Sequence, residues 1–170
     1  MGPMTVSSFL DHYGRIRKRT TRLLGVVRPE HLDFAYKPGK FTVADQIRHI
    51  AAIERYLFAE TLAGRKSCYQ GCGPELAEGL ENIIALVGRF HDESLEIIRG
   101  LSDEDLSTNC LTPAGAEVPR GKWLLLLAEH EIHHRAELYL YLNLMDVETP
   151  PIYGLTAEKV EELSIPRTEA

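Results

Sequence analysis

The chain has 170 residues, of which 44% are hydrophobic and 26% charged, and its formal net charge is −6. This composition is that of a globular protein, and the length suits one domain with its own core, so we expect a single domain over residues 1–170. Three cysteines are too few, and odd in number, for a disulfide scaffold. The acidic balance argues against nucleic acid as the main partner.

No apolar stretch approaches the roughly 18 residues that a membrane span needs. The longest, residues 123–128, is ended by Glu129. The N-terminus lacks the basic region and apolar core of a secretory signal. We therefore expect a cytoplasmic protein that does not contact a membrane.

Helical periodicity governs the first half of the chain, and no segment alternates like a strand. The first helix is expected over residues 6–27, because proline at position 29 disfavours helix in the residue before it. The second is expected over residues 42–63. Thr42 and Asp45 form a capping box at its start, with Asp in place of the usual Glu, and Gly64 suits its end.

The second half predicts two more long helices. One is expected over residues 74–100, with Pro74 at its first position, and the other over residues 122–145. Between them, residues 102–120 form a long connection, which is often functional. A short helical stretch is expected at residues 157–163. Four long helices in one small domain predict an all-α four-helix bundle with a short additional C-terminal helical segment.

Two histidines of the last long helix point to a metal site. His130 and His134 are four residues apart, so they lie one above the other on one helix face and can bind the same ion. That face is partly apolar and therefore points inward, and such a pair in a bundle favours a metal site over isolated structural histidines. The other residues of this face are Trp123, Leu127, Glu137, Leu138 and Tyr141.

A metal needs a third protein ligand, and His49 is the best candidate. It lies in the middle of the second helix, surrounded by isoleucines at positions 47, 50 and 53. His91 competes, because it lies on the apolar stripe of the third helix. For His91 the alternative is a buried histidine with ordinary hydrogen bonds.

The segment 130–134 also matches the zinc-protease motif H-E-x-x-H, in which Glu131 would be the general base. The context argues against a metallopeptidase. No further Gly and His of the extended motif follow His134, and no strand is visible to hold a peptide substrate. The metallopeptidase therefore remains the weakest of three interpretations.

The sequence resembles the DinB-like (DinB/YfiT-like) family of bacterial metalloenzymes. The resemblance rests on residues 41–50 (FTVADQIRHI), 129–142 (EHEIHHRAELYLYL) and 150–155 (PPIYGL), and on the order of the helices. It implies a four-helix bundle whose metal is held by three histidines. Matched position by position, these are His49, His130 and His134. Glu129 stands where the family often has Asn, and residues 136–137 are Ala-Glu where many members have Gly-Gln.

The resemblance also implies a chemistry. Some members of the family are S-transferases or isomerases that use a low-molecular-weight thiol. Three neutral imidazoles leave a divalent ion positively charged with open positions, and such an ion can hold a thiol as thiolate. Zinc or nickel is the preferred ion, and iron, manganese or copper also suits imidazole ligands. The alternative is a metal-binding stress-response protein without turnover.

No catalytic residue can be assigned from the sequence. Four side chains are candidates for contacts around the metal or the substrate, although each also suits a purely structural role: Tyr56, His91, Glu137 and Tyr141. Cys68 and Cys72 are four apart and are interpreted as two free thiols rather than a redox pair or a second metal site.

The last long helix carries a second apolar face, which a bundle helix does not normally need. Extra apolar surface of this kind predicts a homodimer, as the family resemblance also implies. The alternative is that the tail covers this face through Ile152, Tyr153 and Leu155. The face consists of Leu124, Leu125, Ala128, Ile132, Ala136, Tyr139 and Leu142.

Overall fold

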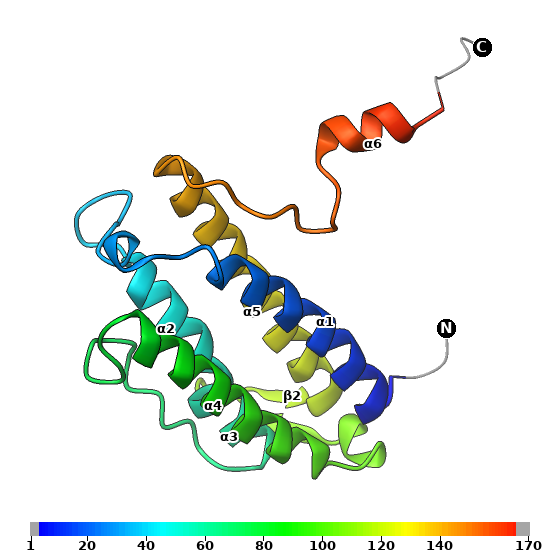
Figure 1. Ribbon diagram of the computed structural model, residues 1–170. Coiled ribbons are helices and arrows are strands. Elements are labelled where there is room, and N and C mark those ends of the chain that lie inside the picture. Colours follow the sequence, from blue (N-terminus) through cyan, green and yellow to red (C-terminus); the bar gives the residue numbers. More distant parts are fainter. Residues whose placement is uncertain (1–3, 166–170) are drawn as a thin grey trace.

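The computed structural model describes residues 4–165 as a bundle of long helices, with a short C-terminal helix that stands apart from it (Figure 1). The all-α prediction is confirmed. The helices are α1 (Val6–Leu24), α2 (Val43–Ile53), α3 (Glu60–Leu62), α4 (Leu80–Arg99), α5 (Arg120–Leu144) and α6 (Ala157–Leu163), with 3-10 turns at Pro29–His31 and Glu104–Ser107.

The first two long helices begin at capping boxes. The Thr42 hydroxyl accepts a hydrogen bond from the backbone N–H of Asp45, and the Asp45 carboxylate accepts one from the N–H of Thr42. Thr5 and Ser8 form the same arrangement at α1. Two backbone N–H groups that a helix start leaves unpaired are thus satisfied each time, as the sequence predicts at Thr42.

The second expected helix is continuous, but it is not α-helical throughout. Between α2 and α3, residues Glu54–Ala59 form a π-helical segment (η2), where each turn holds one residue more. This segment places Glu54 fully inside the bundle, against Arg17 of α1. Apolar periodicity cannot distinguish one wide turn from an ordinary one, so the sequence did not predict it.

The expected start of the third long helix was wrong. The third long helix begins at Leu80 and not at Pro74, because the buried Arg48 guanidinium of α2 holds the preceding loop. Its Nε and Nη1 donate to the carbonyls of Cys72 (2.7 Å) and Ala77 (3.1 Å).

The connection over residues 102–120 contains a small antiparallel hairpin, formed by β1 (Asn109–Leu111) and β2 (Glu117–Pro119). Cys110 pairs with Val118 at its centre. Three-residue strands are too short to show alternation, so no strand was expected.

The core has two apolar clusters, one near each end of the bundle. Between them lies a buried polar network in which Arg17 meets two carboxylates, those of Glu54 and Glu131. His91 Nδ1 lies 2.8 Å from Glu54 Oε1, and the Thr20 hydroxyl donates to Glu131 Oε1 at 2.6 Å. The network connects α1, η2, α4 and α5 and therefore fixes which side of α5 faces α1.

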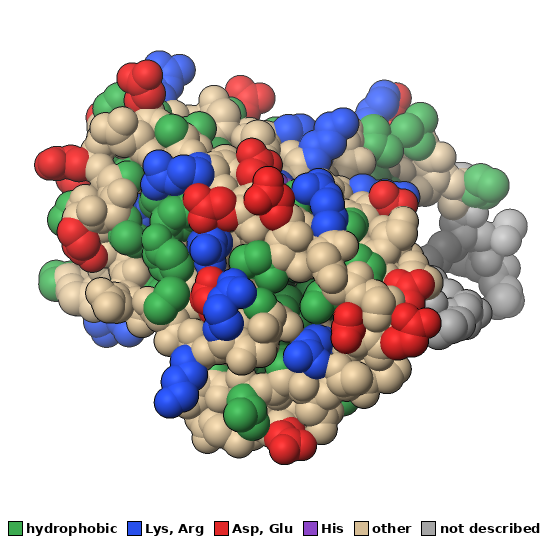
Figure 2. Space-filling view, turned by 90° about the horizontal axis from the view of Figure 1, so that it is seen from below, with side chains coloured by type: hydrophobic (Ala, Val, Ile, Leu, Met, Phe, Trp, Pro, Cys, Tyr) green, Lys and Arg blue, Asp and Glu red, His purple; other side chains and the backbone are tan. Residues whose placement is uncertain are grey.

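The surface carries both signs of charge. On the face seen in Figure 2, acidic and basic side chains are interspersed around hydrophobic ones. Among residues 4–165, no helix combines the length and the apolarity that crossing a bilayer requires.

Candidate metal centre

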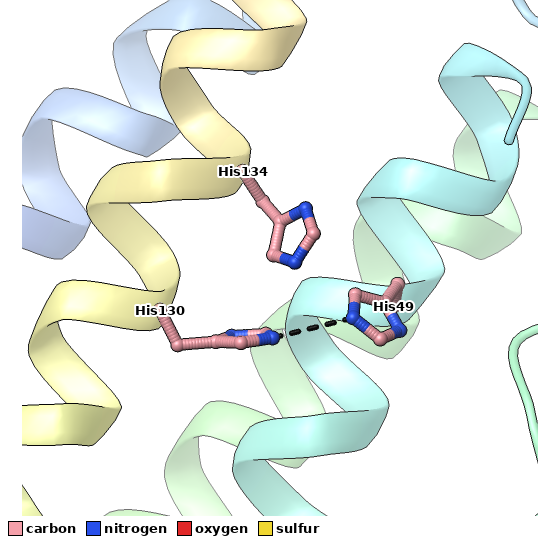
Figure 3. A group of neighbouring side chains, drawn as sticks. All are labelled: His49, His130 and His134. Carbon is pink, nitrogen blue, oxygen red and sulfur yellow. Dashed lines mark hydrogen bonds between the residues drawn. The ribbon is translucent and has the colours of Figure 1, made fainter.

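Three imidazole rings converge between α2 and α5 (Figure 3). His49 comes from α2, while His130 and His134 project from successive turns of α5. Their ligand atoms lie within 4.8 Å of one another. The structure therefore brings together the three histidines that the sequence singles out.

The spacing of the rings suits a metal ion. Nε2 of His130 and Nε2 of His49 are 3.2 Å apart. Two nitrogens bound to one tetrahedral zinc at about 2.05 Å are about 3.3 Å apart. The three donors are neutral imidazole nitrogens with no carboxylate among them, and zinc binds ligands of this kind. The three histidines therefore fit a divalent ion.

The outer ring nitrogens of two histidines are held by neighbouring side chains. His49 Nδ1 lies 2.8 Å from the Tyr69 hydroxyl, and His134 Nδ1 lies 2.8 Å from both Glu137 Oε2 and Gln46 Oε1. Gln46 Nε2 also donates to Glu137 Oε2 at 2.8 Å. Such contacts fix ring orientation and leave Nε2 free for a metal, as is usual for ligating histidines.

Burial keeps the three rings neutral. It is the largest cause that lowers the pKa of His49 to about 4 and that of His130 to about 3, and the neighbouring histidines lower both further. Burial also lowers the pKa of His134, against the opposing effect of Glu137. Near pH 7 each ring therefore offers a lone pair without first losing a proton.

The rings are half-buried and lie against aromatic side chains. The Phe41 ring centroid is 5.1 Å from that of His49, and the Phe58 centroid is 6.0 Å from that of His130. The centre thus combines apolar walls with ligands that are still reachable from solvent. This combination suits a site that takes a small molecule rather than a closed structural site.

The other side chains expected around the metal divide into two groups. Glu137 contacts His134 directly. The Tyr141 ring packs edge-on to the Phe34 ring, with centroids 5.7 Å apart, beside the N-terminal end of α2. Tyr56 packs instead against Phe90 of α4, and His91 belongs to the buried network around Glu54. The expectation that His91 could be a ligand is therefore not supported by its position.

Two contacts of the centre were missed in the sequence. Gln46 lies three residues before His49 on the same helix face, so its spacing was a usable signal. Tyr69 lies in the loop after α3, where no periodicity exists to orient a side chain. Cys68 and Cys72 surround Tyr69 in this loop and are both free thiols, the first exposed and the second buried.

The position of Glu131 argues against a metallopeptidase. Its carboxylate faces α1, where it accepts from Thr20 and lies 2.9 Å from Arg17 Nη2. A general base would have to face the same space as His130 and His134.

A second cluster of ligand atoms comes from His133, His134 and Glu137 and is more exposed than the three-histidine centre. It shares His134 with the centre itself and Glu137 with the contacts around it.

Comparison with known proteins decides the family. The sequence profile of the DinB superfamily matches residues 12–138. The chain belongs to the DinB superfamily. The uncharacterized protein YjoA of Bacillus subtilis is 31% identical to it over 153 residues, which are 87% of this chain and 93% of YjoA.

Two solved structures show how widely the DinB fold is shared. A DinB-like protein from Bacillus cereus superposes with a TM-score of 0.76 at 18% identity, covering 88% of this chain and 99% of that one. A mycothiol-dependent maleylpyruvate isomerase superposes with a TM-score of 0.58, also at 18% identity, covering 79% of this chain and 63% of that enzyme. At these identities the likeness establishes the fold alone.

Proposed function

We propose that this DinB protein is a metal-dependent enzyme that activates a low-molecular-weight thiol for attack on an electrophile, as an S-transferase or isomerase does. The observation that carries the proposal is the convergence of three neutral imidazole nitrogens from His49, His130 and His134. A divalent ion bound by them would lower the pKa of a coordinated thiol and hold it as thiolate near pH 7.

The remaining contacts of the centre have defined tasks in this proposal. Tyr69 and Glu137 orient two of the rings through their outer nitrogens, and Gln46 holds the Glu137 carboxylate in place. Phe41 and Phe58 give the centre apolar neighbours beside His49 and His130, and a lower local polarity strengthens electrostatic interactions. None of these groups needs to transfer a proton.

The mycothiol dependence of the maleylpyruvate isomerase supports the same chemical class. Zinc or nickel is the ion we expect, and iron, manganese or copper would fit the same ligands.

A conjugation assay tests this function. Purified protein loaded with zinc or nickel is incubated with several small thiols and a chromogenic aryl halide, and thioether formation is followed against the uncatalysed rate. We expect thiol-dependent turnover in wild type and in His133→Ala, and loss of that turnover in His130→Ala. Bound metal without turnover for any thiol would favour the non-catalytic metal-binding protein, and turnover that survives His130→Ala would contradict the proposal.

A further inference from the structure

A cavity of about 680 Å³ lies between the β-hairpin and the loop that follows α3. The loop lines it through residues 64–67, and the hairpin lines it through residues 109–113 and 115. Thr61 of α3 and Arg120, the first residue of α5, complete the wall. We call this space the hairpin cavity. None of the three histidines of the metal centre lines it, so it is a separate feature of the molecule.

The charged side chains that line the hairpin cavity are all basic. They are Arg65, Lys66 and Arg120, and no Asp or Glu lines it. The acid Glu117 accepts from Asn109 Nδ2 at 2.9 Å, but it is not a wall residue. Three cations around one cavity stand out in a chain whose formal net charge is −6. The wall therefore favours an anion as the ligand and disfavours a cation.

Arg120 is held in place by uncharged groups. Its Nε donates to the Leu62 carbonyl at 2.8 Å, and its Nη1 donates to the Asn109 carbonyl at 3.0 Å and to the Thr108 hydroxyl. Its Nη2 takes part in none of these bonds and lies beside Gly64, 3.9 Å from where a Cβ would stand. No carboxylate of residues 4–165 forms an ion pair with Arg120. The guanidinium is thus fixed in position while its charge lacks a partner.

The start of α5 adds to the positive potential at Arg120. The N-terminal end of a helix carries a partial positive charge, which an acidic residue in the first turn or a side-chain cap usually offsets. The first turn of α5 has no acidic residue, and its N-cap residue, Pro119, makes no side-chain cap bond. The partial charge of this 25-residue helix therefore acts in the same direction as the Arg120 guanidinium.

Of the three cations, only Arg65 has an acidic partner. Its Nε and Nη2 donate to the two carboxylate oxygens of Glu60 at 2.5 and 3.0 Å, and Glu60 is shared with Arg55. Lys66 is exposed and forms no ion pair in the described part of the chain. Two positive charges, those of Lys66 and Arg120, thus remain for a ligand, which matches an anion with two negative charges.

The hairpin gives the cavity an apolar wall as well. Leu111 and Pro113 line it, and Leu111 is 60% exposed although it is a large apolar side chain. Cys110, which also lines the cavity, is buried beneath them in the hairpin. An apolar wall contributes nothing to binding a bare inorganic ion, whereas it can bury the hydrocarbon part of an organic one.

From these observations we propose that the hairpin cavity binds an organic dianion, a small molecule with two negative charges on carboxylate or phosphate groups and an apolar body. Lys66 and Arg120 bind the charged groups, and Leu111 and Pro113 contact the body. The inference does not depend on the proposed enzyme, because the cavity and the metal centre have no lining residue in common.

NMR spectra of the full chain that resolve each backbone N–H test the site by titration with small anions at low salt and pH 8. Suberate carries its two charges at opposite ends, hexyl phosphate carries both at one end, and octanoate is the singly charged control. We expect saturable shifts with at least one dianion, confined to residues 64–67, 109–115 and the indole N–H of Trp123, which donates to Thr61 at 2.7 Å. Octanoate should bind about tenfold more weakly, since it lacks one charge.

Charge reversal gives a matched pair of variants. Lys66→Glu removes a cation from the wall and should weaken binding of the dianion by about tenfold. Lys37→Glu makes the same change of net charge at an exposed lysine that does not line the cavity, and its affinity should stay within about twofold of wild type because salt screens distant charges. Equal weakening in both variants would show a response to net charge alone and would refute the site.

Two further results would overturn the proposal. One is the absence of saturable shifts with both dianions up to about 10 mM, or octanoate binding as tightly as they do. The other is a set of shifts centred on His49, His130 and His134 that disappears after dialysis against a chelator, because the anion would then occupy the metal centre. Shifts at the hairpin cavity that persist after that dialysis support the proposal whether or not the centre holds a metal.

Discussion

Replacing Glu131 with Gln separates the structural role of this residue from the catalytic role that the H-E-x-x-H pattern would give it. The carboxylate is almost fully buried, accepts from Thr20 and lies 2.9 Å from Arg17 Nη2. Glutamine keeps the shape and one acceptor but removes the charge. Two charge-assisted contacts become neutral, at a cost of about 1 kcal/mol each, so the free energy of unfolding should fall by about 2 kcal/mol.

The fall in the free energy of unfolding of Glu131→Gln should stay below the 3–5 kcal/mol that is typical of breaking a buried ion pair, because Arg17 still faces Glu54. In urea unfolding, a slope of about 2 kcal/mol/M turns the loss into a midpoint shift of about 1 M. Metal content should not change. The control is Glu129→Gln, an exposed position on the same helix, which should shift stability by less than about 0.5 kcal/mol. Loss of metal from Glu131→Gln with unchanged stability would refute this reasoning.

Three further predictions concern the centre and its loop. Tyr69→Phe removes the partner of His49 Nδ1, so metal dissociation constants from chelator competition should rise about tenfold, whereas Tyr56→Phe should bind metal like wild type. The metal-free protein should unfold more easily at pH 5 than at pH 7. Between about pH 6.5 and 4 the unfolded chain protonates His49 and His130 while the fold keeps them neutral, so the free energy of unfolding drops as pH falls. The two pKa shifts correspond to about 2 kcal/mol per ring at pH 5, and solvent screening of the partly exposed rings should reduce the loss to about 1 kcal/mol each. Equal urea midpoints at the two pH values would contradict this. Arg48→Met should free the loop over residues 65–79, so that limited proteolysis cuts there faster while α2 stays folded, and an unchanged cleavage rate would show that the Arg48 bonds do not hold the loop.

The features that the sequence predicts well are those with local causes. The helix α1, the capping box at Thr42 and the shared face of His130 and His134 each depend on residues within a few positions of one another. That His49 faces this pair could be anticipated from its place on an inward helix face and from the family resemblance. Whether these nitrogens bind a metal stays a prediction.

The features that the sequence missed depend on contacts between distant segments. The third long helix starts late because Arg48, more than twenty residues earlier, bonds the loop carbonyls before it. Glu131 sits beside a metal-ligand candidate in sequence, yet its partners Thr20 and Arg17 lie on α1. Tyr69 reaches His49 from a loop without periodicity. No local pattern encodes such pairings.

The metal content of the purified protein tests the central claim most directly. Elemental analysis is performed on wild type, His130→Ala and the exposed-position control His133→Ala, each purified without chelator and then reconstituted with zinc or nickel. The three-histidine centre predicts about one divalent ion per chain in wild type and in His133→Ala, and almost none in His130→Ala. Wild type without stoichiometric metal after reconstitution, or full metal content in His130→Ala, would contradict it.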